Sequence, residues 1–150
     1  MEKVELNKEM KLSEHFTLGE LTKTSIKTED QNIPSRVAIE NLKNLCENWL
    51  EALRQAQGPL IINSGYRSPE VNKRAGGSAT SNHLTGCAVD IRVSGFEQAI
   101  RYASILLDIS DGTKRDYDEL YIERNSERRY WIHFAVRPRD NRRKGNFILT

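Results

Sequence analysis

The length, composition and charge of this chain exclude several classes of protein. At 150 residues, with 37% apolar and 29% charged residues, the chain is expected to form one globular domain that spans residues 1–150. A net charge of +2 is too small to indicate nucleic acid as a partner, and no apolar run is long enough to cross a membrane. We therefore expect neither of those partners, and we expect a monomer.

The N-terminal residues and the cysteines bear on the compartment. Residues 1–6 contain no apolar segment of the kind found in secretory signals, so the protein is expected to be cytoplasmic as synthesised. Two cysteines, Cys46 and Cys87, make a poor disulfide framework and suit a reducing compartment.

The first strongly patterned segment is a helix from about residue 34 to residue 53. Pro34 suits its first turn, and Ser35 is a good cap. Apolar residues recur at steps of three and four and define one buried stripe, which comprises Ala38, Leu42, Leu45, Cys46, Trp49, Leu50 and Leu53.

A short apolar strand at residues 60–62 leads into a polar loop that runs from residue 63 to residue 86. Ser68 and Pro69 predict a helix of one or two turns within this loop. Long loops with little regular structure are uncommon unless they carry function, so we expect functional residues here.

The second half of the chain predicts three strands and one helix. Residues 88–93 alternate as a strand does, and residues 94–97 form a capping box that opens a helix whose buried stripe begins at Phe96. Residues 117–123 and 131–136 predict a β-hairpin. A basic stretch follows from Arg137 to Lys144 and is expected to be a solvated surface, with binding to an anionic polymer as the alternative.

Strand parity brings three possible metal ligands together. In the strand at 88–93 and in the second hairpin strand, the apolar residues define the core face, so Asp90 and His133 lie on the opposite face. His83 lies in the loop that leads into the first of these strands. Two imidazoles and one carboxylate suit Zn²⁺ and leave a fourth position for water, as in catalytic zinc sites. The sequence therefore predicts an α+β fold with a small antiparallel sheet, helices packed on one face and the zinc site on the other.

Two other candidate ligands are less well supported. Cys87 lies between His83 and Asp90, and a thiolate binds zinc well, but Cys87 has the parity of the core residues. His15 has no second ligand type nearby and is expected to act as a capping or packing residue.

Three longer motifs resemble a known family. They are residues 64–72 (Ser-Gly-Tyr-Arg-Ser-Pro-Glu-Val-Asn), residues 81–91 (Ser-Asn-His-Leu-Thr-Gly-Cys-Ala-Val-Asp-Ile) and residues 131–133 (Trp-Ile-His). Together they resemble the zinc D-Ala-D-Ala carboxypeptidase family of peptidoglycan peptidases, which includes phage-type endolysins and shares a hedgehog-like fold. The resemblance covers most of the chain.

The resemblance implies a role for several residues. His83, Asp90 and His133 would be the zinc ligands, and Arg67 would hold a substrate carboxylate or the developing oxyanion. A fixed guanidinium is suited to that task because amide hydrolysis builds negative charge on the carbonyl oxygen. The alternative for Arg67 is a structural salt bridge. Ser81 would bind substrate or hold the loop.

One position departs from the family pattern. Many relatives carry an acidic residue three positions before the last histidine, whereas this chain carries Tyr130 there, and a phenol is too weakly acidic to serve as a base at neutral pH. Parity places Glu123 on the face of His133, opposite residue 130 or 131, so we predict Glu123 as the general base. Glu119 has the same parity and is the fallback. A surface ion pair is the alternative role for Glu123.

The predicted function is a zinc metallopeptidase that hydrolyses a peptide bond in peptidoglycan, as a D-Ala-D-Ala carboxypeptidase or as a cell-wall endopeptidase or endolysin. The departure at Tyr130 favours one alternative, a non-catalytic zinc-binding module of the same fold. A metal-free wall-binding domain is a third. The expected partners are peptidoglycan peptides, reached at the cell wall after phage-type release.

Overall fold

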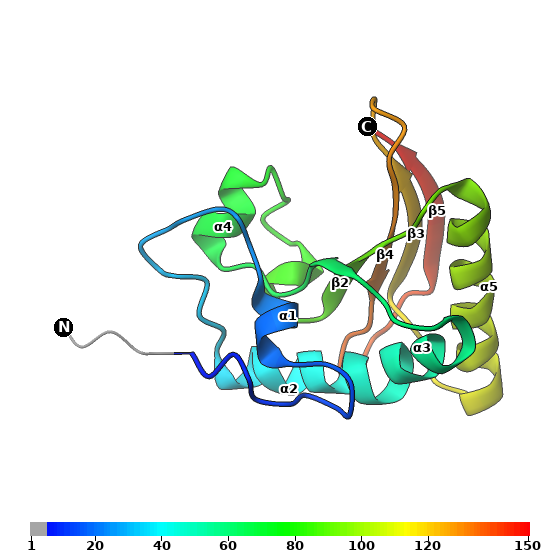
Figure 1. The fold of residues 1–150 in the computed structure, drawn as a ribbon, viewed down its shortest axis with the longest axis horizontal. Helices are drawn as coiled ribbons and strands as arrows, with labels where there is room; N and C mark the ends of the chain where they lie inside the picture. The colour runs from blue at the N-terminus through cyan, green and yellow to red at the C-terminus, as the bar shows by residue number, and fades with distance from the viewer. Residues whose placement is uncertain (1–5) are drawn as a thin grey trace.

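The computed structural model describes residues 6–150 (Figure 1). The helical segments are α1 (Leu18–Thr22), α2 (Arg36–Leu45), the π-helical turn η1 (Cys46–Leu50), α3 (Glu51–Gln57), α4 (Pro69–Arg74), the 3₁₀ turn η2 (Asn82–Thr85) and α5 (Phe96–Thr113). The strands are β1 (Ile62–Ser64), β2 (Ala88–Arg92), β3 (Glu119–Arg124), β4 (Tyr130–Ala135) and β5 (Lys144–Leu149). The fold is α+β, as the sequence predicts.

The five strands form one mixed sheet in the order β1-β2-β4-β3-β5. All neighbours are antiparallel except β3 and β5, which are parallel. The expectation of an antiparallel sheet is therefore wrong at this edge. The segment after β4 crosses to the start of β3, where the Lys144 N–H donates to the Asp118 carbonyl at 2.9 Å, so β5 runs in the direction of β3.

The long helix buries the apolar stripe that the sequence predicts. The Ser35 hydroxyl accepts a hydrogen bond from the Ala38 N–H at 3.1 Å and caps α2. Helical structure continues through η1 and α3 to Gln57 and ends at Gly58, whose φ of 88° suits glycine. Every residue of the predicted stripe is at most 1% exposed.

Helix α5 differs in its cap and in its buried face. Its N-cap is Gly95, which makes no side-chain cap, so the capping box at residues 94–97 does not form. Phe96 is 52% exposed, and the buried stripe comprises Ala99, Tyr102, Leu106 and Ser110. The hydroxyl of Ser110 donates to the Arg115 carbonyl, which satisfies the buried polar group and allows this face to pack inward.

The sheet has one face in the core and one face toward a loop region. Core residues of the three central strands are Val89, Ile91, Leu120, Ile122, Ile132 and Phe134. Trp49 of η1 packs on Phe134 with ring centroids 5.1 Å apart, and α5 lies along the same side of the sheet (Figure 1). Helix α4 and η2 lie on the other side (Figure 1). No helix within residues 6–150 is long and apolar enough to span a membrane.

Candidate metal and catalytic site

The register of β2 and β4 places Asp90 directly opposite His133. Both side chains extend from the face of the sheet opposite to the core, and Asp90 Oδ1 lies 3.1 Å from His133 Nδ1. Asp90 is 8% exposed. The register of these two strands therefore agrees with the shared face that strand parity predicts for Asp90 and His133.

His83 reaches the same point from η2. Ser81 caps this turn by accepting from the His83 N–H at 3.2 Å, and Gly86 ends it with a φ of 73°. A Cβ at Gly86 would lie 2.3 Å from the carbonyl oxygen of Ala38, so glycine is required for η2 to approach α2. His83 Nδ1 donates to the Gly65 carbonyl at 2.6 Å, which leaves Nε2 facing Asp90 Oδ1 at 3.4 Å.

The three side chains fit a single tetrahedral ion. With metal–ligand bonds of about 2.0–2.1 Å, a tetrahedral zinc separates its ligand atoms by about 3.3 Å. Asp90 Oδ1 lies 3.4 Å from His83 Nε2 and 3.1 Å from His133 Nδ1, close to that spacing. All three ligand atoms lie within 4.8 Å of one another. Cys87 is not part of this group; burial raises the pKa of its thiol.

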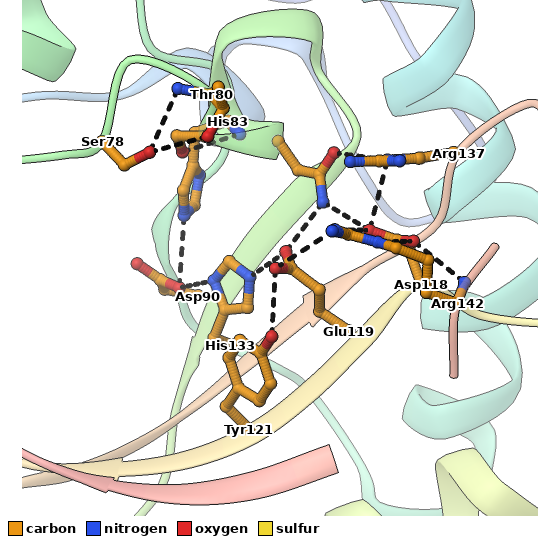
Figure 2. Close-up of polar contacts among 12 residues, drawn as sticks. Ser78, Thr80, His83, Asp90, Asp118, Glu119, Tyr121, His133, Arg137 and Arg142 are labelled. Carbon is orange, nitrogen blue, oxygen red and sulfur yellow. Dashed lines mark hydrogen bonds and ion pairs between the residues drawn. The ribbon is translucent and has the colours of Figure 1, made fainter. Parts of the chain in front are cut away.

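A second layer of polar groups holds His133 (Figure 2). Its Nε2 donates to Glu119 Oε1 at 2.9 Å, and Glu119 also accepts from the Asn82 amide at 2.7 Å and from the Tyr121 hydroxyl at 3.1 Å. The Tyr121 ring stacks on the imidazole with centroids 5.3 Å apart. Each histidine therefore has one ring nitrogen bound to an acceptor and the other directed at Asp90, as in carboxylate–histidine–metal arrangements.

These contacts shift the pKa values of the group. Burial alone would lower the pKa of His133, but its hydrogen bonds to Asp90 and Glu119 raise it to about 9. Burial opposes ionisation of both carboxylates. Even so, the hydrogen bonds from His133 and Asn82 lower the pKa of Glu119 to about 2, and the two histidines hold the pKa of Asp90 well below its usual range. Burial and Glu119 raise the pKa of Tyr121 to about 12, so its hydroxyl stays a donor.

Asp118 anchors the wall behind this layer. Its side chain is fully buried. It accepts from Arg142 at 2.9 and 2.7 Å and from Asn82 at 2.8 Å, and it forms an ion pair with Arg137 at 3.2 Å (Figure 2). Although burial opposes ionisation, these donors lower the pKa of Asp118 to about 2. Two members of the basic stretch are thus fixed in the cleft wall rather than freely solvated.

Glu123 lies on the site face, opposite Trp131 in the β3–β4 register. It accepts a hydrogen bond from the Trp131 indole and lines the cleft. Burial and the charge of Asp90 raise the pKa of Glu123. Glu119 and Glu123 therefore differ: Glu119 is a strongly ionised partner of His133, and Glu123 is the more basic carboxylate.

Tyr130 is on the other face of the sheet. Strand β4 is regular from Tyr130 to Ala135, so residue 130 has the opposite parity to His133. Its ring packs edge-on against Phe96 of α5 at 6.0 Å. In this chain the position three residues before the last histidine does not reach the site.

Arg67 and Ser81 both line the cleft. Arg67 donates from one terminal nitrogen to Asp90 Oδ2 at 3.2 Å and from Nε to Ser64 at 3.0 Å, so it is held beside the candidate ligands. His15 lies elsewhere and contacts Glu51 at 2.6 Å, in line with its expected packing role.

Sequence reasoning did not single out Asn82, Asp118 or Arg142. Strand parity was a usable signal for Glu119 and Tyr121, because both share the alternation of Glu123. The partners of Asp118 carry no such signal, since Asn82 and Arg142 come from separate loops 36 and 24 residues away along the chain.

These side chains surround a cleft of about 650 Å³. A site of two histidines and one carboxylate, with a basic carboxylate and a guanidinium in the same cleft, is of the type found in mononuclear zinc hydrolases.

Comparison with known proteins agrees with that class. The sequence profile of the Peptidase M15 family matches residues 14–118, and the chain belongs to this family. The chain is also 32% identical over 80 residues to a zinc D-Ala-D-Ala carboxypeptidase of Streptomyces albus G. That match covers 51% of this chain and 31% of the relative, so the chain matches about a third of the relative's length. Both comparisons support a zinc peptidase, and Zn²⁺ is the metal that they imply.

Proposed function

We propose that this chain is a peptidase that hydrolyses a peptide bond in peptidoglycan, with Zn²⁺ held by His83, Asp90 and His133. The proposal covers residues 1–150 as one peptidase domain. One observation carries it: Asp90 Oδ1 lies 3.4 and 3.1 Å from one nitrogen of His83 and of His133, and the remaining nitrogen of each histidine is bound by Gly65 or Glu119.

The residues around the ligands have separate tasks. Bound zinc would supply Lewis acidity and lower the pKa of a water to about 7. Glu123 takes a proton from the attacking water as its oxygen bonds to the carbonyl carbon, and Arg67 stabilises the negative charge on the carbonyl oxygen. Glu123 then returns the proton to the leaving nitrogen as the C–N bond breaks. The products are one carboxylate and one amine.

The environment of Glu123 supports this role. A general base acts best when its pKa lies near the working pH, and burial together with Asp90 moves the pKa of Glu123 in that direction. Glu119 is less suited, because its contacts with His133 and Asn82 hold its pKa near 2. Glu119 is therefore proposed as the residue that orients His133, and Ser81 as the residue that holds η2 and borders the substrate.

The family and the relative support a proposal for the substrate and the site of action. We propose peptidoglycan peptides as the substrate and the cell wall as the site of action, reached by an endolysin-like protein after phage-type release. A monomer is sufficient for this, because every proposed site residue comes from one chain.

Two measurements on the same sample test the proposal: zinc stoichiometry by metal analysis, and mass spectrometry of fragments released from purified sacculi. A peptidase should hold one zinc and release peptide fragments that disappear with chelator. Zinc without any released fragment would instead indicate the non-catalytic module. A folded protein that does not retain zinc at neutral pH would contradict the proposed metal site.

A further inference from the structure

A second cavity adjoins the cleft at the hairpin end of the sheet. It measures about 630 Å³, and Trp131 lines both this cavity and the cleft that contains the candidate zinc ligands. Trp131 is two residues from His133 on the same face of β4. The second cavity therefore begins next to the proposed reaction centre, at the following side chain on that face.

The second cavity is strongly basic. Arg92, Arg128 and Arg129 line it, and none of its lining residues in the described part of the chain is acidic. Arg92 is bound to a neutral partner, since its Nε donates to Asn63 at 3.1 Å. Arg129 contacts Glu127 at 3.6 Å, but both side chains are more than 70% exposed, so that pair neutralises little charge. The cavity therefore favours an anionic ligand.

A third cavity adjoins the central cleft on the other side of the candidate ligands. A cavity of about 750 Å³ begins behind η2, and four of its lining residues, Thr80, Ser81, Asn82 and Arg137, also line the central cleft. The reaction centre thus lies in the middle of a series of three adjoining cavities rather than at a closed end.

The arginines nearest the candidate ligands already have acidic partners within the protein. Arg67 is paired with Asp90, and both Arg137 and Arg142 are paired with Asp118. Release of a C-terminal residue is favoured by a cation that binds the terminal carboxylate close to the scissile bond.

Among the arginines that line the central cleft and the cavity beyond Trp131, those with no buried acidic partner are Arg92, Arg128 and Arg129, and all three lie beyond Trp131. The remaining cation of the central cleft is Lys144, at the end of β3 away from Trp131.

We infer that the substrate is an acidic peptide that lies across the cleft, with an anionic group over Arg92, Arg128 and Arg129, and that the bond cut is internal. The inference rests on the proposed peptidase function and specifies it as endopeptidase activity. Trp131 separates the two cavities, and the peptide backbone passes over its indole.

Product analysis tests the position of the cut. The substrate is a stem peptide whose C-terminus is amidated, so that it has no terminal carboxylate. An endopeptidase should cut it into two peptides that mass spectrometry identifies. If instead the enzyme leaves this peptide intact and releases single amino acids from free C-termini, the inference is wrong, and loss of that release in Lys144→Gln would assign the terminal carboxylate to the opposite end of the cleft.

A charge comparison tests the basic cavity without requiring turnover. Calorimetry measures the affinity for a stem peptide with its free glutamate carboxylate and for the same peptide with that carboxylate amidated. The preference for the acidic peptide should fall about 5- to 10-fold in the double variant Arg128→Gln/Arg129→Gln, the effect of removing two exposed charge interactions. It should also shrink at high salt.

Arg101→Gln is the matched control. Arg101 is an exposed arginine paired with Glu97 on α5, remote from the cleft, and resembles Arg129 in its setting. The preference should be unchanged in this variant. An equal preference in the wild type and in the double variant would overturn the assignment of the basic cavity. A protein that retains this preference but holds no zinc would overturn the proposed function alone.

Discussion

Each candidate ligand in this site is fixed by a contact that leaves one donor atom directed at a common point. Gly65 holds His83, Glu119 holds His133, and Asp90 lies between the two rings. Because the side chains are positioned before a metal arrives, removing one of them should affect metal binding more than the fold.

The first prediction concerns His83. His83→Ala should remain folded, because the turn η2 is held by Ser81 and Gly86, but it should bind much less zinc, since only two ligands remain. Metal analysis gives the stoichiometry, and circular dichroism checks the fold. An unchanged ratio of one zinc per chain would contradict the ligand assignment.

The two carboxylates on β3 give the second prediction. Glu123→Gln should retain zinc and lose ~10²-fold or more in turnover, because it removes the general base. Glu119→Gln should instead weaken zinc binding by roughly 10- to 100-fold, the usual cost of losing a group that orients a ligand histidine. Zinc affinity and turnover measured on both variants separate the roles. Turnover of Glu123→Gln within a few-fold of wild type would move the base to Glu119.

Arg67 is the subject of the third prediction. Arg67→Lys should keep its charge beside Asp90 and retain zinc, but it should lose about 10²-fold in rate, by analogy with the loss of one oxyanion donor. Lysine lacks the planar set of donors that lets Arg67 contact Ser64 and Asp90 together. Steady-state kinetics with zinc-loaded protein measure the loss. A rate equal to wild type would leave Arg67 with a structural role only.

At the scale of the elements, the packing of η2 on α2 depends on a single glycine. The fourth prediction is that Gly86→Ala destabilises the protein by about 1–3 kcal/mol, because the residue has a positive φ and its Cβ would lie 2.3 Å from the Ala38 carbonyl oxygen. Urea unfolding measures the change. Gly112→Ala in α5 is the control, since a Cβ there meets nothing within 4 Å.

Much of the arrangement of elements could be predicted from periodicity. The stripe on residues 38–53 and the alternation in β2, β3 and β4 are local patterns, and they placed Asp90, His133 and Glu123 on one face. The parallel strand β5 could not be predicted in this way, because its paired residues in β3 lie 25 positions upstream and its own residues show no clear alternation. The prediction for the buried face of α5 is wrong at its start, because Tyr102 and Ser110 pack inward while Phe96 does not.

In the candidate site, too, local patterns predict some residues and not others. The possible ligands could be identified from residue types and strand parity. The network of Asn82, Asp118 and Arg142 depends on loops that meet only in the folded chain, and no spacing in the sequence encodes that meeting.

At the scale of the whole molecule, the charged cluster links stability to pH. Without metal, His133 has a pKa of about 9, above its ordinary value of 6.5, so the folded state holds a proton that the unfolded state releases. This contribution is fully present below pH 6.5 and is lost as the pH rises through 9. Zinc requires the neutral ring, so its stabilising effect should increase over the same interval.

The fifth prediction follows from this linkage. The melting temperature with chelator should fall between pH 7 and pH 9.5, whereas the difference between zinc-loaded and metal-free protein should widen. Calorimetry in buffers of different ionisation enthalpy should also show about one proton released per zinc near pH 7.5. A metal-free protein whose melting temperature rises over this range would contradict the proposed state of His133.

The parallel pairing of β5 has a consequence for the order in which the molecule assembles. The candidate ligands come from η2, β2 and β4, whereas the wall that carries Arg142 and Lys144 forms only when the chain after β4 returns to lie along β3. The β3–β5 pairing joins Glu119 to Lys144, 25 residues apart, whereas the β2–β4 pairing joins Asp90 to His133, 43 residues apart. Pairings across a wider separation cost more loop-closure entropy and form later in folding. The wall that carries Arg142 and Lys144 is therefore expected to form before the candidate ligands meet, so an early folding intermediate would carry this basic wall but would not yet capture metal.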